Sequence, residues 1–302
     1  MPGPRVTVVT PSYNMAEFLE ETIQSVLAQD YPDLEYIVMD ACSTDGTQEI
    51  LHRYQDRLRF VSAPDLGAAD AVNRGFSLGD GESLAWLTAD DTYLPGAIAT
   101  AVAALQSDPT LRAIYGQAWL VERSGKYLYR YPTQSADHLS QECCICQPAC
   151  FIRRPAFEAA GKLDIQLQVA YDYALWMRVR GKWLYIGDYL ATSRMHAANK
   201  TLSNRKTGYR ESIQALSRNY GYVPFQWIYG YACYLVDGRD QFHDPIRPSV
   251  FKFALSLPMG FWRNRRRLRR YWKECRAVMT WAGLMRRWND SWLGRLWHIG
   301  PK

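Results

Sequence analysis

The sequence lacks the marks of several common protein classes. Seven cysteines spread over 302 residues are too sparse for a small secreted scaffold held by disulfides, and their odd number favours reduced thiols. No stretch of uninterrupted apolar residues reaches the length, about 18 to 20, that a helix needs to span a bilayer, so we predict no transmembrane helix. The N-terminus shows no secretory signal, which favours a cytosolic protein.

Two further absences narrow the functional classes. The chain has no long low-complexity tract, and its 48% apolar and 22% charged residues are typical of a folded protein, which excludes a disordered one. No G-x-G-x-x-G follows a predicted strand, so a dinucleotide-dependent dehydrogenase is not expected. A chain of 302 residues can form one large or two small domains with a sizeable core.

Between residues 5 and 116, short β-branched runs alternate with segments of helical period. This alternation predicts an α/β fold with a mainly parallel sheet covered by helices on both faces. In the first helical segment, apolar residues recur every three or four positions and predict a core-facing stripe of Leu19, Ile23, Val26 and Leu27.

After residue 116 the pattern becomes mixed. Residues 118–131 predict a hairpin that turns at Ser124 and Gly125, which adds antiparallel pairing to the sheet. A helix is predicted near residues 171–180, ending at Gly181, and a strand follows it. Beyond residue 200 a polar helix is predicted to about residue 219, and the aromatic segments 222–236 and 249–262 follow it.

The C-terminal segment 260–302 differs in composition from the rest of the chain. It holds twelve Lys or Arg against two acidic residues, and six of the eleven Trp. Trp beside Arg on a helix with an apolar face is typical of segments at a membrane interface. A dimer-forming helix and a solvated helix packed on the body are the alternatives. Apolar residues recur here at helical spacing, namely at Leu268, Tyr271, Trp272, Cys275, Val278, Met279, Ala282 and Met285.

Carboxylates follow two of the predicted strands. In open parallel sheets, ligands bind at the carboxyl ends of the strands, where Asp40 and the pair Asp90 and Asp91 are expected. Adjacent carboxylates can hold a hard divalent cation against a diphosphate with few other protein ligands. The alternatives are a helix N-cap for the pair and a turn-forming role for Asp40.

Four motifs follow one another along these strand ends: VTVVTPSYN, SVLAQDYPDLEYIVMDACSTDGT, DLGAADAVNRGF and WLTADD. In order and spacing they resemble the nucleotide-binding half of the family 2 glycosyltransferases, inverting enzymes of the GT-A fold that use nucleotide diphosphate sugars. The resemblance covers about residues 4–200. It implies a catalytic domain over residues 1–200, with a nucleotide-binding half (1–116) and an acceptor half (117–200), and a helical extension over 201–302.

The resemblance implies roles for the first donor-site residues. Pro11 and Tyr13 would line the nucleobase and ribose. Asp40 would accept a hydrogen bond from the base, which favours UDP over GDP or dTDP. Asp65 and Asp70 would shape the same wall, although Asp70 could instead be a solvated residue on a helix face.

The same resemblance assigns the diphosphate region. Arg74 would face the diphosphate, and Asn73 would brace its loop or lie solvated on a helix. Asp91 would be the direct ligand of a Mg²⁺ or Mn²⁺ ion, and Asp90 would contact the ribose or the sugar. His196 follows the last predicted strand, where the family often has a histidine that reaches the metal or the leaving diphosphate; a structural histidine is the alternative.

Inversion requires a base that takes the proton from the attacking acceptor hydroxyl. The segment VAYDYALWMRVRG resembles the family's base-bearing helix, which makes Asp172 the candidate. An ordinary first-turn Asp that offsets the helix dipole is the alternative. Trp176 could stack on the acceptor sugar, but core packing is favoured for it.

Two further side chains near these motifs are Arg194 and Cys146. Arg194 could support the diphosphate charge. Cys146 stands where many members of the family have His, and the cysteines around it, at 143, 144 and 150, lack the paired C-x-x-C knuckles of a zinc site, so buried thiols are favoured.

Together these patterns predict a metal-dependent hexosyltransferase that is peripheral on the inner face of the cell membrane. It would move one sugar to a glycan or lipid-linked acceptor, in surface polysaccharide or glycolipid assembly, because the QxxRW motif of processive members is absent. An anionic membrane surface is an expected partner and nucleic acid is not; a homodimer stays open. The alternatives are a sugar nucleotidyltransferase and a non-catalytic membrane-binding protein with a decayed GT-A fold.

Overall fold

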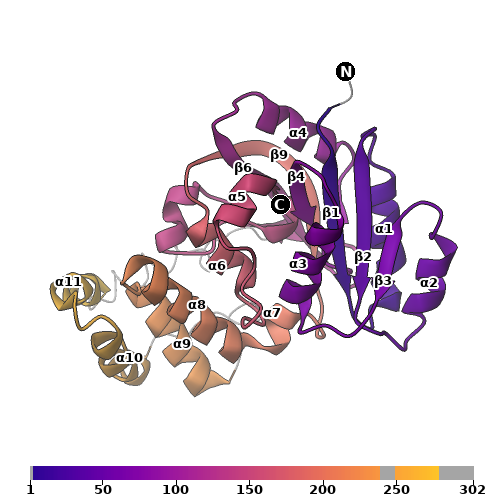
Figure 1. The fold of residues 1–302 in the computed structure, drawn as a ribbon. Helices are drawn as coiled ribbons and strands as arrows, with labels where there is room; N and C mark the ends of the chain where they lie inside the picture. The colour runs from indigo at the N-terminus through magenta and orange to yellow at the C-terminus, as the bar shows by residue number, and fades with distance from the viewer. Residues whose placement is uncertain (1–2, 239–248, 279–302) are drawn as a thin grey trace. The chain divides into compact units, whose positions relative to one another are not determined.

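A computed structural model of the chain describes residues 3–238 and 249–278. The chain divides into two compact units (Figure 1). The first unit comprises Met1–Ala136 and Ile145–His196, and the second comprises Asp137–Cys144 and Ala197–Lys302.

The first unit is built on one sheet, which has nine strands among the described residues. Their spatial order is β3-β2-β1-β4-β8-β6-β9-β5, with β7 paired to β6. The strands are β1 (Val6–Ser12), β2 (Leu34–Asp40), β3 (Arg59–Ser62), β4 (Ser83–Trp86), β5 (Thr92–Tyr93), β6 (Leu111–Glu122), β7 (Tyr127–Arg130), β8 (Cys150–Arg153) and β9 (Lys182–Met195).

The longest pairings of the sheet are parallel. Strand β1 lies parallel to β2 and β4, β2 to β3, and β6 to β9, whereas β8, β5 and β7 pair antiparallel to their neighbours. This confirms the predicted α/β fold with a mixed, mainly parallel sheet. The hairpin predicted over residues 118–131 is formed by β6 and β7, and its turn uses Gly125 at φ +85°, a conformation that glycine adopts readily.

Helices cover both faces of this sheet. The helices of the first unit are α1 (Ala16–Leu27), α2 (Thr47–Arg53), α3 (Ala68–Leu78), α4 (Ala97–Gln106), α5 (Arg154–Ala159) and α6 (Tyr171–Arg178), together with the 3₁₀ turn η2 (Gln147–Ala149). Apolar residues of α1, α2 and α4 pack on one face with Val6 and Val8 of β1. On the other face Phe76 of α3 contacts Trp86 of β4 and Phe157 of α5.

The predicted stripe of the first helix is confirmed. Leu19, Ile23 and Val26 of α1 are fully buried and Leu27 is half-buried. Burial of such side chains contributes about 1.5 to 3 kcal/mol each, so this stripe fixes α1 against the sheet.

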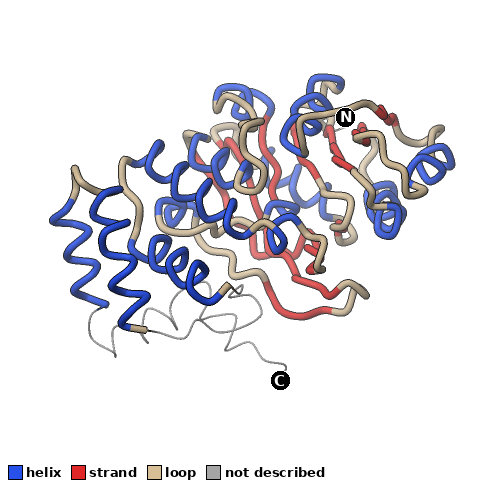
Figure 2. Tube along the Cα trace, turned by 90° about the horizontal axis from the view of Figure 1, so that it is seen from below, coloured by secondary structure: helices blue, strands red, loops and turns tan. Residues whose placement is uncertain are grey.

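All strands of the described residues lie in the first unit (Figure 2). The second unit is helical and contains α7 (Lys200–Ser203), α8 (Arg205–Tyr220), α9 (Phe225–Asp237), α10 (Val250–Arg263) and α11 (Leu268–Val278). It also holds all but the first residue of the 3₁₀ turn η1 (Ala136–Ser140). Within the described residues, no helix is both long enough and apolar enough to cross a membrane.

Residues 137–144 belong to this second unit, although the sequence analysis placed them in the catalytic domain. The carbonyl oxygen of Gln141 accepts hydrogen bonds from Gln226 Nε2 and Trp227 Nε1 of α9, each at 2.6 Å. These two contacts tie the segment to the helices. In the predicted tail helix, Tyr271 and Cys275 are buried and Leu268 and Trp272 are exposed, and the positions from Met279 onward lie outside the described residues.

Candidate active site

The carboxyl ends of β1 and β2 lie side by side. Parallel pairing places Pro11 opposite Met39 and Ser12 opposite Asp40. Tyr13 follows directly and is 62% exposed, whereas Pro11 and Asp40 are buried. The sheet therefore brings Pro11, Tyr13 and Asp40 to one edge, as the motif order suggested.

Asn14 joins the two loops at this edge. Its backbone N–H donates to Ser43 Oγ at 2.8 Å, and its side-chain Oδ1 accepts from Thr44 N at 2.9 Å. Its φ of +51° lies in the left-handed region, which asparagine tolerates better than most residues. The sequence analysis gave Asn14 no role, although an asparagine two residues after a strand is a turn signal that could have drawn attention to it.

Asp40 is almost fully buried and is held by four donors. Its carboxylate accepts from Ser43 N (3.1 Å), Ser43 Oγ (2.5 Å), Gln48 Nε2 (2.6 Å) and Ser62 Oγ (2.7 Å). An ionised carboxylate offers about four acceptor sites. A nucleobase could therefore bind Asp40 only by replacing one of these donors, and the sequence analysis did not identify Gln48 or Ser62.

The two acidic residues predicted to shape the next loop bond to that loop's own backbone. Asp65 Oδ1 accepts from Gly67 N at 2.8 Å, and Asp70 Oδ2 accepts from Leu66 N at 3.1 Å. Both carboxylates hold the turn that leads from β3 into α3. Their structural role is thus to fix the shape of the turn between β3 and α3, the predicted wall of the donor site.

Asn73 and Arg74 lie on α3 and bind different partners. Asn73 makes two hydrogen bonds to Leu163, from Nδ2 to the carbonyl (2.9 Å) and from Leu163 N to Oδ1 (3.1 Å). It therefore braces the loop that precedes α6. Arg74 Nη1 donates to the carbonyl of Pro64 at 2.9 Å and lies 3.9 Å from Asp70, with its side chain 39% exposed.

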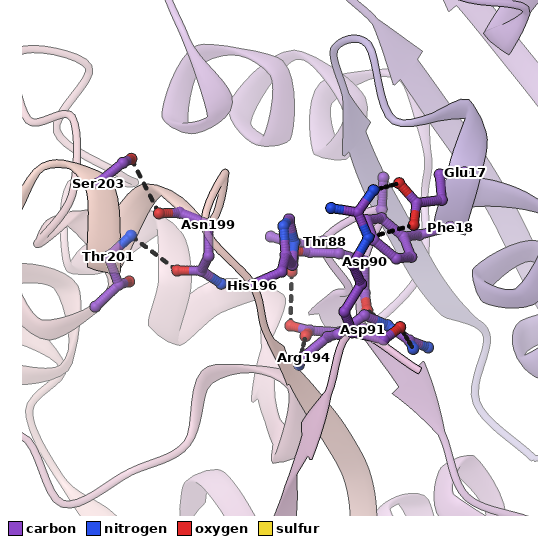
Figure 3. A network of polar contacts seen from close by, with 12 residues as sticks. Glu17, Phe18, Thr88, Asp90, Asp91, Arg194, His196, Asn199, Thr201 and Ser203 are labelled. Carbon is purple, nitrogen blue, oxygen red and sulfur yellow. Dashed lines mark hydrogen bonds and ion pairs between the residues drawn. The ribbon is translucent and has the colours of Figure 1, made fainter. Parts of the chain in front are cut away.

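A turn after β4 carries Asp90 and Asp91, and the end of β9 lies against it (Figure 3). Strand β5 pairs antiparallel with β9, with Thr92 opposite Thr192, and the hydroxyls of these two residues are hydrogen-bonded at 2.7 Å. This pairing brings His196 next to the turn, although the two segments are about a hundred residues apart.

Asp90 and His196 contact each other directly. His196 Nε2 lies 3.0 Å from Asp90 Oδ2, and both residues are less than 10% exposed. The imidazole also packs against Phe18 of α1, at 4.8 Å between ring centroids. A carboxylate oxygen and an imidazole nitrogen thus meet at the carboxyl edge of the sheet.

Asp91, the expected metal ligand, has both carboxylate oxygens bound by protein groups. Oδ1 accepts from Arg194 N at 2.8 Å, and Oδ2 accepts from Thr88 Oγ1 at 2.6 Å (Figure 3). Burial, and then the negative charge of neighbouring Asp90, raise the pKa of Asp91 well above its usual range. Both carboxylate oxygens of Asp91 therefore help to hold the turn.

Arg194 is buried, and its guanidinium binds groups of the protein itself. Its Nε donates to the carbonyl of Asp90 at 2.9 Å, Nη1 donates to the carbonyl of Arg123 at 2.9 Å, and Nη2 pairs with Glu21 at 2.6 Å. The guanidinium also lies over the ring of Phe18. Arg194 therefore braces the Asp90–Asp91 turn from inside the protein.

Thr22 of α1 braces the same turn and was not identified from the sequence. Its hydroxyl lies 2.9 Å from the carbonyl of Ala89 and 2.8 Å from that of Asp91. The side chain is fully buried. A threonine on the buried face of a predicted helix is a polar exception to the apolar pattern, which is the signal that could have found it.

Asp172 lies in the first turn of α6 and is half-buried. Its Oδ1 accepts from Tyr173 N at 2.7 Å. Burial, and then the negative charges of Asp172, Asp90 and Asp91, raise the pKa of Tyr171, so all three carboxylates lie within electrostatic range of this hydroxyl. The predicted base thus lies in the same region as the Asp90–His196 pair.

Trp176 is part of the core, the role that the sequence favoured. It is 1% exposed and stacks on Trp86 with 5.3 Å between centroids. All seven cysteines carry free thiols. Cys146 is buried, and burial raises the pKa of Cys144 to about 12. Among the described residues, no group of three or more His, Cys, Asp or Glu side chains is placed to hold a metal ion.

Comparison with known families decides the assignment. The family model described as glycosyl transferase family 2 matches residues 7–161, about half of the chain. The chain belongs to glycosyl transferase family 2. This family assignment favours a glycosyltransferase over the sugar nucleotidyltransferase alternative.

Relatives and solved structures agree with this assignment. An uncharacterized glycosyltransferase of Rickettsia prowazekii is 29% identical over 216 residues, which cover 66% of both chains. The putative teichuronic acid biosynthesis glycosyltransferase TuaG of Bacillus subtilis is 42% identical over 94 residues, 30% of this chain and 37% of that one. The mannosyltransferase PcManGT of Pyrobaculum calidifontis, solved with GDP-Man and Mn²⁺, superimposes with a TM-score of 0.57 at 22% identity and covers 72% of this chain and 64% of its own. The chain thus spans about two thirds or less of these relatives, and the structural likeness shows a shared GT-A-like fold.

Proposed function

We propose that this family 2 glycosyltransferase is a metal-dependent inverting enzyme that transfers one hexose at a time, with UDP as the favoured nucleotide. The observation that carries the proposal is the approach of His196 Nε2 to Asp90 Oδ2, at 3.0 Å, on the carboxyl edge of the parallel strands. The half-buried Asp172 in the same region supplies a second carboxylate with a different task.

The residues present fit a divalent cation bound together with a diphosphate. A carboxylate oxygen and an imidazole nitrogen suit Mn²⁺ and, for the oxygen, Mg²⁺, and such ions commonly use one or two protein ligands plus substrate phosphates. Asp90 and His196 would hold the ion, while Asp91 and Arg194 keep the turn in place. When bound, the cation supplies charge that stabilises the leaving nucleoside diphosphate.

Residues at the strand ends would form the wall of the donor site. Pro11 and the exposed ring of Tyr13 would line the nucleobase and ribose, and the loop held by Asp65 and Asp70 would close the wall. Asp40 would accept from the base after one of its four protein donors is released. Arg74 is partly exposed and bound only to a carbonyl and a weak ion pair, so its guanidinium can turn to the diphosphate, with the loop that Asn73 braces beside it.

Asp172 would act as the base. Its carboxylate has one oxygen on the Tyr173 N–H, which orients the group at the start of α6. It would take the proton of the acceptor hydroxyl while that oxygen attacks opposite the leaving diphosphate. The acceptor would be a glycan or a lipid-linked glycan of a surface polysaccharide or glycolipid, as the name of TuaG suggests for that relative. A cytoplasmic position, peripheral on the inner face of the membrane, belongs to the same proposal.

Ligand-induced stabilisation tests the donor site directly. Binding to the native state raises the free energy of unfolding by mass action, by about 2.7 kcal/mol at a hundredfold excess over Kd, and so raises the thermal midpoint. We expect UDP with Mn²⁺ to raise the midpoint and UDP alone to raise it less. A shift with GDP or dTDP but not with UDP would show that the donor carries that nucleotide instead. No shift with any of the three would contradict the proposal. Asp90→Asn should remove the metal dependence of this shift. The matched control Asp56→Asn, at an exposed position outside the site, should keep it.

A further inference from the structure

Helix α10 (Val250–Arg263) exposes its apolar side and buries its polar side. Val250, Phe251 and Trp262 are 87%, 65% and 63% exposed. Ala254 and Pro258 are exposed as well. Four of these residues follow one another at intervals of four and Phe251 lies beside Val250, so they share one face of the helix, which we name the α10 stripe.

The opposite face of α10 holds small and polar residues in the interior of the second unit. Lys252 is 5% exposed and its ammonium pairs with Asp237 of α9 at 2.6 Å. Ser256 is fully buried, and Gly260 lies against Tyr271 of α11, which leaves no room for a larger residue. The orientation of α10 is thus fixed by specific contacts, and the exposure of its apolar stripe follows from them.

The stripe continues onto α11. The half-buried ring of Phe261 lies 5.9 Å from Trp272, which is 41% exposed. Leu268, one helical turn before Trp272, is 44% exposed. Asn264 holds the turn between the two helices through hydrogen bonds to the N–H and carbonyl of Val223. The apolar surface therefore extends over both helices of the α10–α11 hairpin.

Positive charge surrounds this apolar surface. Between Trp262 and Val278 the sequence has eight Arg or Lys against the single acid Glu274. All eight cations are exposed, namely Arg263, Arg265, Arg266, Arg267, Arg269, Arg270, Lys273 and Arg276. An exposed apolar patch framed by cations complements a surface that is negatively charged outside and apolar within.

We propose that the α10–α11 hairpin docks the protein on the headgroup region of an anionic phospholipid membrane. The stripe would enter the boundary between headgroups and acyl chains, and the cations would bind lipid phosphates. Beside the rings of Phe251 and Trp262, the stripe carries the aliphatic Val250, Ala254 and Pro258, which suit acyl chains and add no stacking surface for bases. This composition favours lipid over nucleic acid.

Pro258 also sets the depth of docking. It has no N–H to donate to the carbonyl of Ala254, four residues before it. A carbonyl without its helical partner needs water or a headgroup nearby, because the hydrocarbon core offers no donor. The helix would therefore lie in the interfacial plane. This inference extends the proposed membrane location and does not depend on the sugar-transfer reaction.

Sedimentation of the full chain with vesicles, without donor or acceptor, tests the docking. Phosphatidylcholine vesicles that contain phosphatidylglycerol should bind the protein, and pure phosphatidylcholine vesicles should bind it weakly. Arg265→Gln with Arg266→Gln should lower the partition coefficient about 25-fold, at about fivefold for each cation. Phe251→Ser with Trp262→Ser should lower it at least about tenfold.

Matched controls lie in the first unit. Arg57→Gln with Arg59→Gln removes two exposed cations there, and Tyr127→Ser removes an exposed aromatic, and both should leave vesicle binding unchanged. Equal binding of wild-type and stripe variant, or tighter binding to an oligonucleotide than to vesicles, would overturn the proposal. So would a lower thermal midpoint or an altered oligomeric state of the stripe variant, because another segment or a second copy would then cover the stripe.

Discussion

The two units of the chain depart from ordinary burial in opposite directions. The first unit buries charged and polar groups at its strand ends, including Asp40, Asp90 and Arg194. The second unit exposes apolar groups along α10 while Lys252 is buried. Both departures cost free energy in the isolated protein, since buried charges lose hydration and exposed apolar groups order water. In the proposed function the polar groups of the first unit serve a nucleotide with a cation, and in the further inference the apolar groups of the second unit serve a membrane.

The largest effect expected within the first unit is on the base. Asp172→Asn should lower the rate of sugar transfer by about 10²- to 10⁴-fold, because an amide cannot take the proton of the acceptor hydroxyl. Nucleotide binding, measured by thermal shift, should persist, since Asp172 does not contact the donor in the proposed mechanism. Asp56→Asn, at an exposed site, is the control. Transfer by Asp172→Asn at the wild-type rate would remove Asp172 from the mechanism.

Substitution of the buried Arg194 tests whether its guanidinium supports the Asp90–Asp91 turn or binds a ligand. Arg194→Gln should lower the free energy of unfolding by about 3 kcal/mol, because Glu21 and two carbonyls lose their donor. Urea unfolding measures this, and Arg59→Gln is an exposed control. Arg194→Lys should restore part of the stability, since an ammonium can still reach Glu21. A stable Arg194→Gln that binds nucleotide more weakly would instead indicate contact with the diphosphate.

The adjacent carboxylates should behave differently. Asp90→Asn should abolish stimulation of transfer by Mn²⁺. Asp91→Asn should lower the apparent affinity for Mn²⁺ by about 10- to 100-fold and keep stimulation at saturating metal, because Asp91 supports the turn through Thr88 and Arg194 N. Metal titrations of transfer rate separate the two patterns. The reverse pattern would restore Asp91 as the direct ligand.

The smallest expected effect concerns the packing that turns the α10 stripe outward. Gly260→Ala should destabilise the protein by about 1 to 3 kcal/mol, because a Cβ there would overlap the buried Tyr271 ring. Vesicle binding should fall in parallel if the hairpin loses its shape. Gly187→Ala in β9, where a Cβ meets open space, is the matched control. Unchanged stability in Gly260→Ala would show that the hairpin can repack and that the exposed stripe is not fixed by this contact.

Much of the fold could be predicted because its signals are local. The strands β1 to β4 and the helices between them follow from alternation of β-branched and helical segments, and the α1 stripe follows from its period. The position of Asp40, Asp90 and Asp91 at strand ends required only the order of the elements and the rule that parallel strands share a carboxyl edge. Leu268 and Trp272 show the limit, because helical period predicted their alignment but not that they would be exposed.

By itself the sequence determined the order of strands and helices, the motifs at the strand ends and the basic, Trp-rich character of the C-terminal helices. Only the tertiary structure decided how the polar groups pair. Antiparallel pairing of β5 with β9 joins residues about a hundred positions apart and so sets His196 on Asp90 and Arg194 on the turn. The buried contacts of Lys252, Ser256 and Gly260 likewise set which face of α10 meets solvent. Local sequence patterns report the period of an element, whereas its partners depend on contacts between segments that are distant in the chain.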